Sequence, residues 1–355
     1  FHIISYLSLL ILKSPMNPLL TMRYTIMGMH LILLCLMLMK ASSTSANGDG
    51  DGDSGCPLGS DTYQYSCPEA EAIIFSWVEQ AISQDSRMAA SLLRLHFHDC
   101  FGCDASVLLD DRDDFVGEKS AAPNLNSLRG FEVIDAIKSE LELVCPETVS
   151  CADILATVAR DSVVLSGGPA WEVKMGRKDS ISASKEAANN NIPAPNSTVD
   201  VLLTKFQNVG LNLQDMVALS GAHTIGKARC STFSSRLQSS SDSSDVNMQF
   251  IQSLQQLCSG EDNTNKVAHL DLATPATFDS QYYVNLLSGE GLLPSDQALV
   301  NGNDHTRQIV ETYVEDPSAF FDDFRYSMVK MGSLGSSTQI DGQIRRDCRT
   351  INLPN

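Results

Sequence analysis

The spacing of apolar and polar residues predicts a protein built mainly from α-helices. From Ala70 onward the apolar positions recur as on one face of a helix, with no Gly or Pro among them. The same spacing predicts further helices over residues 88–101, 131–144, 150–166, 198–210, 213–220, 278–287, 305–314 and 319–331. Regular alternation, which is typical of β-strands, occurs only in short pieces such as residues 171–175. The pattern therefore predicts a mostly α architecture with minor short β-structure and no internal repeat.

Loops are expected where Gly, Pro, Asn and Asp gather between these helices. A Gly-Gly-Pro run, whose proline is Pro169, ends the helix at 150–166. Loops are predicted at residues 104–123, at the Asn- and Pro-rich residues 187–197, and at a low-complexity tip over residues 239–245. The second of these loops contains a glycosylation sequon, Asn196-Ser197-Thr198.

The first forty-six residues are typical of a targeting segment. Residues 31–39 form an apolar run of nine, which is too short to span a bilayer. Lys40 and then small residues follow, as at a secretory cleavage site. We expect residues 1–46 to be a cleaved signal peptide with upstream residues, and favour this over a membrane anchor. Residues 47–60 are then a flexible acidic leader, and residues 61–350 a single domain.

Charge narrows the range of partners. The first forty-six residues hold three basic and no acidic residues, so the 22 remaining basic residues face all 43 acidic ones, a formal charge of −21. Such a charge repels phosphate backbones, so we expect no nucleic acid partner.

The cysteine count indicates an oxidised, secreted protein. Of ten cysteines, Cys35 leaves with the signal peptide, and nine remain. In a secreted chain this predicts four disulfides and one leftover thiol, for which Cys56 in the leader is the natural candidate. A zinc site at Cys100-x-x-Cys103 is the alternative. We favour it less, because no second Cys/His pair has matching spacing.

The segment from Arg94 to Ser106 carries the densest chemistry in the chain. It gathers a cation, two imidazoles, two carboxylates and two thiols in thirteen residues. Arg94 and His98 lie four residues apart, so on a helix their side chains share one face. A fixed positive charge beside a neutral imidazole suits proton transfer and stabilisation of developing negative charge.

Three later segments carry candidate ligands. Residues 217–226 form an apolar helix that delivers His223 between glycines; a structural histidine is the commoner reading of such a residue. Asp271 and Asp279 flank threonines in a turn that fits calcium, although a capped helix start explains this segment alone better. Asp296 follows an apolar run, and its alternative is a solvated turn or helix cap.

Taken together, these segments make the chain resemble the secreted plant haem peroxidases of class III, from Asp61 to about Cys348. The specific motifs are residues 94–106, 149–155 and 218–226. The resemblance implies the plant-type haem peroxidase fold, in which a distal half (about 61–195) and a proximal half (about 196–350) sandwich haem b. It implies an oxidoreductase that reduces hydrogen peroxide to water and oxidises phenolic donors by one-electron steps, in hydrogen peroxide catabolism and the response to oxidative stress.

The resemblance also implies a location and a state of assembly. The protein would be a secreted monomer in the apoplast or cell wall, with the vacuole left open, and would have no membrane association after signal cleavage.

The resemblance assigns roles on the distal side. His98 would take a proton from hydrogen peroxide and return it to the departing oxygen. Arg94 would stabilise the charge separation as the O–O bond breaks. Asn124 would accept a hydrogen bond from the other nitrogen of His98, leaving the outer nitrogen free as a base. Phe97 would shield the haem.

On the proximal side, the resemblance makes His223 the axial iron ligand. Asp296 would accept its second N–H and make the imidazole a stronger donor. Pro169 would lie at the channel of the reducing substrate. The implied proximal calcium ligands are Thr224, Asp271, Thr274, Thr277 (by its carbonyl) and Asp279. The implied disulfides are Cys67–Cys145, Cys100–Cys103, Cys151–Cys348 and Cys230–Cys258.

The chain departs from the family pattern at one place. The family has Asp-Cys-Phe-Val-x-Gly-Cys-Asp-x-Ser, whereas here Gly102 follows Phe101 directly. The missing Val supplies a carbonyl ligand of the family's distal calcium. The remaining candidates are Asp99, Gly102, Asp104 and Ser106, with Glu118 through water. We expect a weakened distal site and a tighter Cys100–Cys103 ring. Either the sequence carries an error or truncated exon junction, or the protein is a variant with an altered distal side.

Two other functions compete with the peroxidase. One is a secreted haem-binding protein whose turnover is impaired by the short distal loop. The other is a calcium-dependent hydrolase, which needs a nucleophile elbow or paired catalytic carboxylates. We find neither in the sequence.

Overall fold

The computed structural model describes residues 58–100, 102–238, 247–260, 265–335 and 342–353. These residues belong to one compact unit that extends from Gly55 to Asn355. The predicted signal peptide, most of the acidic leader with Cys56, and the tip at 239–245 lie outside the described residues. Within the described part of the chain, no helix is long and apolar enough to cross a membrane.

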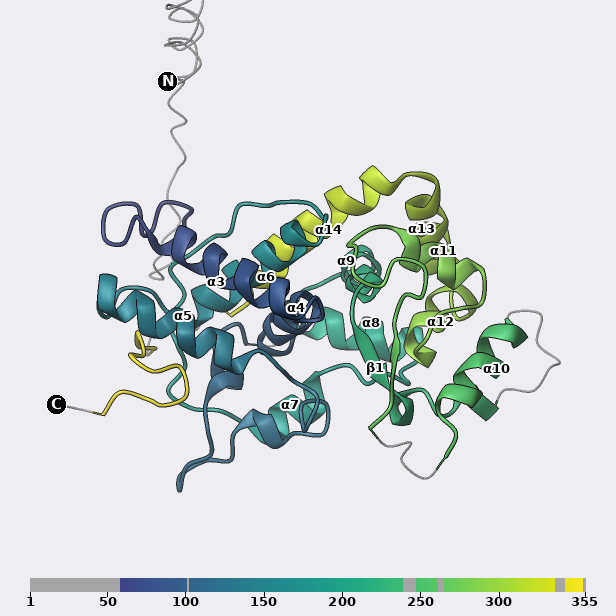
Figure 1. The fold of residues 1–355 in the computed structure, drawn as a ribbon, viewed down its shortest axis with the longest axis horizontal. Helices are drawn as coiled ribbons and strands as arrows, with labels where there is room; N and C mark the ends of the chain where they lie inside the picture. Colours follow the sequence, from purple (N-terminus) through teal and green to yellow (C-terminus); the bar gives the residue numbers. More distant parts are fainter. Residues whose placement is uncertain (1–57, 101, 239–246, 261–264, 336–341, 354–355) are drawn as a thin grey trace, which may run out of the picture. The chain divides into compact units, whose positions relative to one another are not determined.

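Helices carry the fold, as predicted from the apolar spacing (Figure 1). The α-helices are α3 (Ala70–Gln84), α4 (Met88–Asp99), α5 (Phe131–Val144), α6 (Cys151–Leu165), α7 (Lys185–Asn191), α8 (Val199–Asn208), α9 (Leu213–Ser220), α10 (Met248–Leu257), α11 (Gln281–Leu287), α12 (Pro294–Asn301), α13 (Asp304–Glu315) and α14 (Pro317–Gly332). The short strands β1 (Lys227–Arg229) and β2 (Val267–His269) pair antiparallel, with Lys227 opposite His269.

The first core forms where α3, α4 and α5 pack around α6. Helix α6 is buried over most of its length, which its almost unbroken run of apolar and small residues allows. Helix α3 contributes Ala70, Ile74 and Val78, one every four residues, so that a single stripe of the helix is buried. Ser150 is the N-cap of α6, because its hydroxyl accepts the N–H of Asp153 at 3.1 Å.

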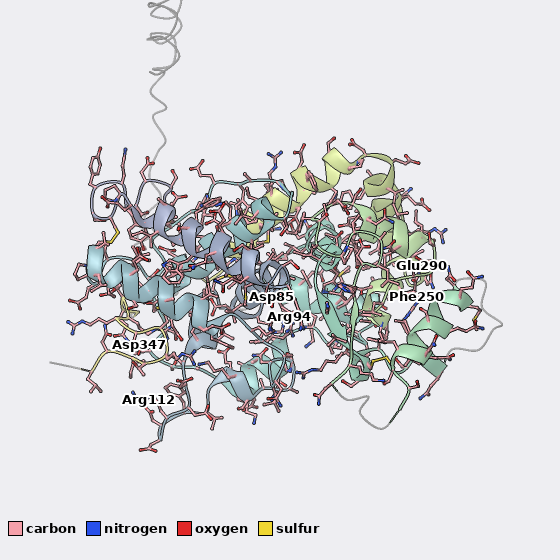
Figure 2. The ribbon with its side chains drawn as sticks, in the orientation of Figure 1. Asp85, Arg94, Arg112, Phe250, Glu290 and Asp347 are labelled. Atoms are coloured by element: carbon pink, nitrogen blue, oxygen red, sulfur yellow. A yellow bond between two sulfur atoms is a disulfide. The ribbon has the colours of Figure 1, made fainter. Side chains whose placement is uncertain are left out.

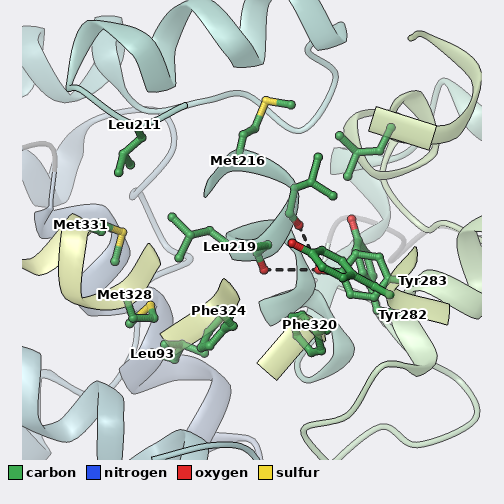
Figure 3. Packing of buried hydrophobic residues seen from close by; sticks show 14 of the residues in the cluster. Leu93, Leu211, Met216, Leu219, Tyr282, Tyr283, Phe320, Phe324, Met328 and Met331 are labelled. Atoms are coloured by element: carbon green, nitrogen blue, oxygen red, sulfur yellow. Dashed lines mark hydrogen bonds between the residues drawn. The ribbon is translucent and has the colours of Figure 1, made fainter. Parts of the chain in front are cut away.

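The second core is rich in aromatic rings and joins α9 to α11, α13 and α14 (Figure 3). Tyr283 lies at its centre, and its hydroxyl donates to the Val217 carbonyl at 3.0 Å. Phe320 packs edge-on against Tyr283, with ring centroids 5.0 Å apart. Gly221 lies so close that a Cβ there would stand 2.4 Å from the Tyr283 hydroxyl. The backbone that leads to His223 can therefore approach this core only without a side chain.

Helix α4 lies between the two cores because successive helical residues point about 100° apart. Leu92 and Leu95 pack into the first core, whereas Leu93 packs into the second. The remaining face carries Arg94 and His98. The two cores thus fix the direction in which these polar side chains point.

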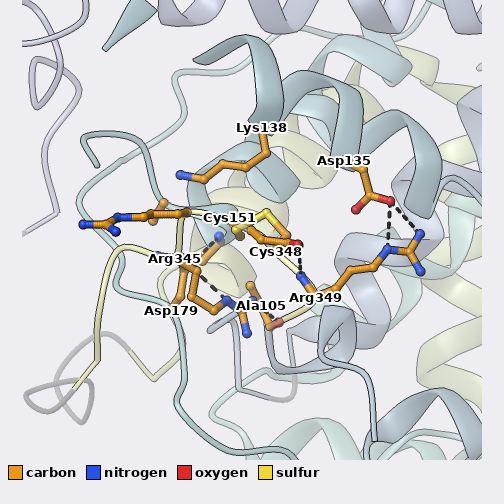
Figure 4. The surroundings of a disulfide bond; sticks show 12 residues. Ala105, Asp135, Lys138, Cys151, Asp179, Arg345, Cys348 and Arg349 are labelled. Carbon is orange, nitrogen blue, oxygen red and sulfur yellow. Dashed lines mark hydrogen bonds and ion pairs between the residues drawn. A yellow bond between two sulfur atoms is a disulfide. The ribbon is translucent and has the colours of Figure 1, made fainter. Parts of the chain in front are cut away.

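The C-terminal segment is fastened to the first half of the fold (Figure 4). Cys348 forms a disulfide with Cys151 at the start of α6. The buried Arg345 donates from its backbone N–H to the Asp179 carboxylate at 2.9 Å. The remaining disulfides are Cys67–Cys145, Cys100–Cys103 and Cys230–Cys258. These are the four pairs that the family resemblance implies.

Several boundaries differ from the sequence predictions. The loop predicted at 187–197 is wrong at its beginning, because α7 occupies Lys185–Asn191. Ser184 caps α7 by accepting the Ala187 N–H at 3.1 Å, and Ala188 is buried. These two contacts outweigh the weak helix propensity of the asparagines. The helix predicted at 278–287 begins only at Gln281, and α10, α12, β1 and β2 were not predicted.

Candidate active site

His98 is held in one tautomer by its neighbour. Its Nδ1 lies 2.6 Å from Asn124 Oδ1, and Asn124 Nδ2 donates to the Glu118 carbonyl at 2.9 Å. The second bond fixes the amide so that Oδ1 faces the imidazole, and Nδ1 must then carry the hydrogen. The lone pair therefore lies on Nε2, the nitrogen opposite Asn124.

The surroundings of His98 keep it neutral. Burial, together with the positive charge of Arg94, holds the pKa of His98 well below its ordinary value of 6.5, while the hydrogen bond that His98 donates to Asn124 acts in the opposite direction. A neutral imidazole with a free Nε2 can accept a proton at physiological pH.

Arg94 is a fixed cation on the same helical face (Figure 2). Figure 2 shows Arg94 near the middle of the view, below α4, and Arg112 at the lower edge. The Arg94 guanidinium donates to the Pro123 carbonyl at 3.0 Å and to the Ser127 carbonyl at 3.1 Å. Burial and two neighbouring arginines lower the pKa of Arg94 to about 10, so it stays charged at neutral pH. The Phe97 ring lies beside His98, with ring centroids 5.9 Å apart.

His223 is the third residue of the short 3₁₀ helix Gly221–Thr224 that follows α9. Its Nδ1 lies 2.7 Å from Asp296 Oδ1, which also accepts the Tyr282 hydroxyl at 3.1 Å. The other Asp296 oxygen caps α12 by accepting the Leu293 N–H at 3.0 Å. The helix-cap reading of Asp296 and its role as a partner of His223 are thus both met. Because Nδ1 donates to Asp296, the free lone pair of His223 lies on Nε2.

The two histidines lie near each other in the fold. The side chain of His223 is 38% exposed, although its partner Asp296 is buried. A charge on His223 is near enough to His98 to lower the pKa of the distal imidazole. The imidazoles of His98 and His223 therefore come near one another from α4 and from the segment after α9, each with its Nδ1 held by a side-chain oxygen.

A cluster of arginines near Arg94 was not found by sequence analysis. Arg87 and Arg94 lie seven residues apart on one helical face, and the charge of Arg87 contributes to the lowered pKa of Arg94. Burial and the charges of Arg129 and Arg229 lower the pKa of Arg87. Asp85 is paired with Arg129 at 2.7 Å. The excess of positive charge suits an anionic group. The seven-residue spacing of Arg87 and Arg94 could have indicated part of this cluster. Arg129 and Arg229 could not have been added to it, because they are distant in sequence.

The proximal calcium candidates form a compact group of oxygens. Thr224 Oγ1 lies 3.2 Å from Asp271 Oδ2 and 3.1 Å from Asp279 Oδ1, and Thr274 Oγ1 repeats both distances. Two hydroxyl protons serve four oxygen–oxygen contacts, so the group has more lone pairs than protons. Such a set fits a cation that prefers oxygen, and calcium takes hydroxyl and carboxylate ligands. Thr277 lies in the same turn, where its N–H donates to the Thr274 carbonyl at 3.1 Å.

The distal candidates lie around a cavity of about 230 Å³ next to His98. The cavity is lined by Asp99, Gly102, Asp104, Ser106 and Glu118, and from the other side by residues of the 180–192 segment. Burial raises the pKa of Glu118 to about 7, opposed by its hydrogen bond with Ser106. Helix α4 ends at Asp99, so the Cys100–Cys103 disulfide does not lie within the helix.

Pro169 is half-buried and follows a tight turn after α6. A Cβ on the preceding Gly168 would lie 2.5 Å from both Phe278 and Val163. The glycine therefore brings Pro169 close to the second core.

The chain belongs to the peroxidase family, whose sequence profile matches residues 74–316. It is a plant class III peroxidase, and its activity is that of a peroxidase. It is 63% identical to Peroxidase 40 of Arabidopsis thaliana over 296 residues, which cover 82% of this chain and 84% of the relative. It is also 53% identical to Peroxidase 9 of Arabidopsis thaliana, over 82% of this chain and 86% of the relative. It is 50% identical to Peroxidase 4 of Vitis vinifera, over 84% of this chain and 93% of the relative. Such peroxidases typically carry haem and calcium and are generally secreted.

Proposed function

We propose that this chain is a haem b peroxidase in which His98 is the distal base and His223 the axial ligand. The observation that carries the proposal is the matched pair of imidazoles. Each has Nδ1 fixed by a side-chain oxygen, at 2.6 Å and 2.7 Å, and the two side chains lie near enough to interact electrostatically.

The residues near the two histidines support the proposal of haem b. A planar group there would receive the Nε2 lone pair of His223 on one face, and His98 and Arg94 would lie over the other. Arg87, Arg129 and Arg229 would offset the negative charge of its two carboxylates. Haem, when bound, supplies the iron that exchanges electrons with peroxide and with the donors.

The protein's own residues transfer the protons of hydrogen peroxide and stabilise the charge that develops on it. His98 Nε2 takes a proton from one oxygen of hydrogen peroxide, and later gives a proton to the other oxygen, which departs as water. Arg94 stabilises the negative charge that develops on that oxygen, because its guanidinium is fixed and charged before the reaction begins. Asn124 keeps His98 in the tautomer that can act as a base.

The proposal extends to the electron donors, the location of the protein and calcium as its second cofactor. Small phenolic donors would each give one electron, with Pro169 beside their path. Calcium would bind at Asp271 and Asp279. We further propose a secreted monomer of the apoplast or cell wall, with neither nucleic acid nor membrane as a partner.

A spectroscopic and kinetic experiment tests the proposal. The mature chain is supplied with haem, and its absorbance spectrum and its oxidation of guaiacol by hydrogen peroxide are recorded. We expect a Soret band and turnover. His223→Ala should alter the band and weaken haem retention, whereas His305→Ala, at an exposed position of α13, should change neither. A Soret band without turnover would favour the haem-binding protein of impaired turnover, and absence of the band would overturn the proposal.

A further inference from the structure

The short distal loop, residues 99–100 and 102–107, turns its own backbone amides toward Asp99. The Asp99 carbonyl accepts the N–H of Gly102 at 3.0 Å and that of Cys103 at 2.8 Å. A carbonyl oxygen has two lone pairs, so these bonds use its acceptor capacity. In this chain the Asp99 carbonyl is not available to a cation.

The Asp99 carboxylate also accepts backbone N–H groups. One oxygen accepts the Ala105 N–H at 2.9 Å, and the other faces the Val107 N–H at 3.4 Å. The neighbouring Asp104 accepts the Ser106 N–H at 3.1 Å. These bonds stabilise the two carboxylates without a metal, and with the Asp99 carbonyl used by backbone and the Val carbonyl missing, the loop falls short of the six to eight oxygen ligands that calcium takes.

Backbone conformation explains how the loop reaches this arrangement. Cys103 and Ala105 have φ values of 52° and 59°, in the left-handed region that non-glycine residues rarely adopt. Two such residues in a loop that is two residues shorter than the family pattern turn successive N–H groups inward. The missing residues are the ones whose backbone would otherwise carry the loop around the ion.

A fixed cation lies against the same loop. Arg345 is fully buried, and its Nη2 donates to the Ala105 carbonyl at 2.6 Å (Figure 4). Burial lowers the pKa of Arg345, but the charges of Asp179, Asp99 and Asp104 favour its charged form. The loop thus has a positive charge of its own beside the distal carboxylates.

The geometry of the side chains agrees with this picture. In the described residues, no group of three or more His, Cys, Asp or Glu side chains converges on a point that could hold a metal ion. Asp99, Asp104 and Glu118 therefore line one cavity without closing on a common centre. The proximal group differs, because there two threonine hydroxyls bring the carboxylates of Asp271 and Asp279 together.

We infer that the distal residues do not fit calcium, and that the loop amides and Arg345 take over its stabilising role. The folded enzyme accordingly binds a single calcium ion, at Asp271 and Asp279. The proximal half of this statement rests on the proposed function. The distal half rests on the loop alone.

The calcium content of the haem-loaded enzyme tests the inference. Four proteins are dialysed at one free calcium concentration, and their bound calcium is measured by inductively coupled plasma mass spectrometry. They are the wild type, Asp104→Asn, Asp271→Asn and a variant with Val-Asn inserted between Phe101 and Gly102. We expect one calcium per chain for the wild type and Asp104→Asn, none for Asp271→Asn, and two for the insertion. Melting temperature with calcium or with EGTA is measured in parallel, and the insertion should show the larger calcium-dependent shift.

The outcomes separate the two halves of the inference. Two calcium ions per wild-type chain, or a loss of calcium in Asp104→Asn, would overturn the distal half, because a hydrated ion would then lie in the cavity. One ion retained in Asp271→Asn would overturn the proximal assignment. Neither result bears on peroxidase turnover, which guaiacol oxidation reports separately. An insertion variant that fails to fold leaves the comparison of the wild type with Asp104→Asn decisive.

Discussion

At the scale of single residues, His98 and His223 each form a hydrogen bond through Nδ1, but their partners differ in charge. His98 donates Nδ1–H to the neutral amide of Asn124, whereas His223 donates to the carboxylate of Asp296. A carboxylate partner makes an imidazole more electron-rich and suits an axial ligand. A neutral amide partner fixes the tautomer and raises the pKa of His98 too little to offset burial and the charge of Arg94, and so suits a base that must begin the reaction neutral.

The pH dependence of peroxide reduction tests this difference. Because the pKa of His98 lies well below 6.5, its neutral form persists as the pH falls through that value, and kcat/KM for hydrogen peroxide should be retained. In Asn124→Asp a negative charge beside the imidazole raises the pKa of His98, so the acid limb of the profile should move to higher pH.

Asp296→Asn is the matched control, because it changes the partner of the other histidine. Its acid limb should stay where the wild-type limb lies. A wild-type rate that falls near pH 6.5, or profiles of Asn124→Asp and the wild type that coincide, would contradict the assignment of His98 as the neutral base.

At the scale of elements, periodicity predicted the long amphipathic helices and failed where local contacts decide. Helix α7 forms in an Asn-rich stretch because Ser184 caps it and Ala188 is buried, and neither contact is visible in composition. The strands β1 and β2 have three residues each, too few for alternation to register. The motifs placed His98 and His223 correctly on helix ends. The arginine cluster could not be predicted, because its members come from separate elements.

Capping contacts of this kind have a measurable effect on stability. Asn303 caps α13, since its Oδ1 accepts the N–H groups of His305 at 2.8 Å and Thr306 at 3.3 Å. Asn303→Ala should lower the free energy of unfolding by about 1 kcal/mol. Asn301→Ala, at the exposed end of α12, should change it by less than about 0.5 kcal/mol. Chemical denaturation of the two variants makes the comparison, and equal losses would show that the cap carries no weight.

At the scale of the whole molecule, disulfides join segments that are distant in sequence. Cys151–Cys348 closes a separation of 197 residues, whereas Cys230–Cys258 closes one of 28. The longer bridge fastens the C-terminal segment, and with it Arg345, to the start of α6. Chain entropy predicts that the longer loop constrains the unfolded state more strongly.

Removing each bridge separates these contributions. Replacing both cysteines by Ser at Cys151–Cys348 should lower the free energy of unfolding by about 2 kcal/mol more than the same change at Cys230–Cys258, from the difference in loop length. Guanidinium unfolding of the two double variants at fixed calcium measures this difference. If the shorter bridge matters as much as the longer one, native-state contacts rather than chain entropy determine the effect.

The proposed function depends on His98 acting as the base toward peroxide. The most direct measurement is the second-order rate at which hydrogen peroxide changes the absorbance spectrum of the haem-loaded enzyme, recorded by stopped flow for the wild type and His98→Ala. Loss of a positioned base should slow this step by about 10²- to 10⁴-fold while the resting enzyme keeps its haem. A His98→Ala enzyme that reacts with hydrogen peroxide at the wild-type rate would contradict the account.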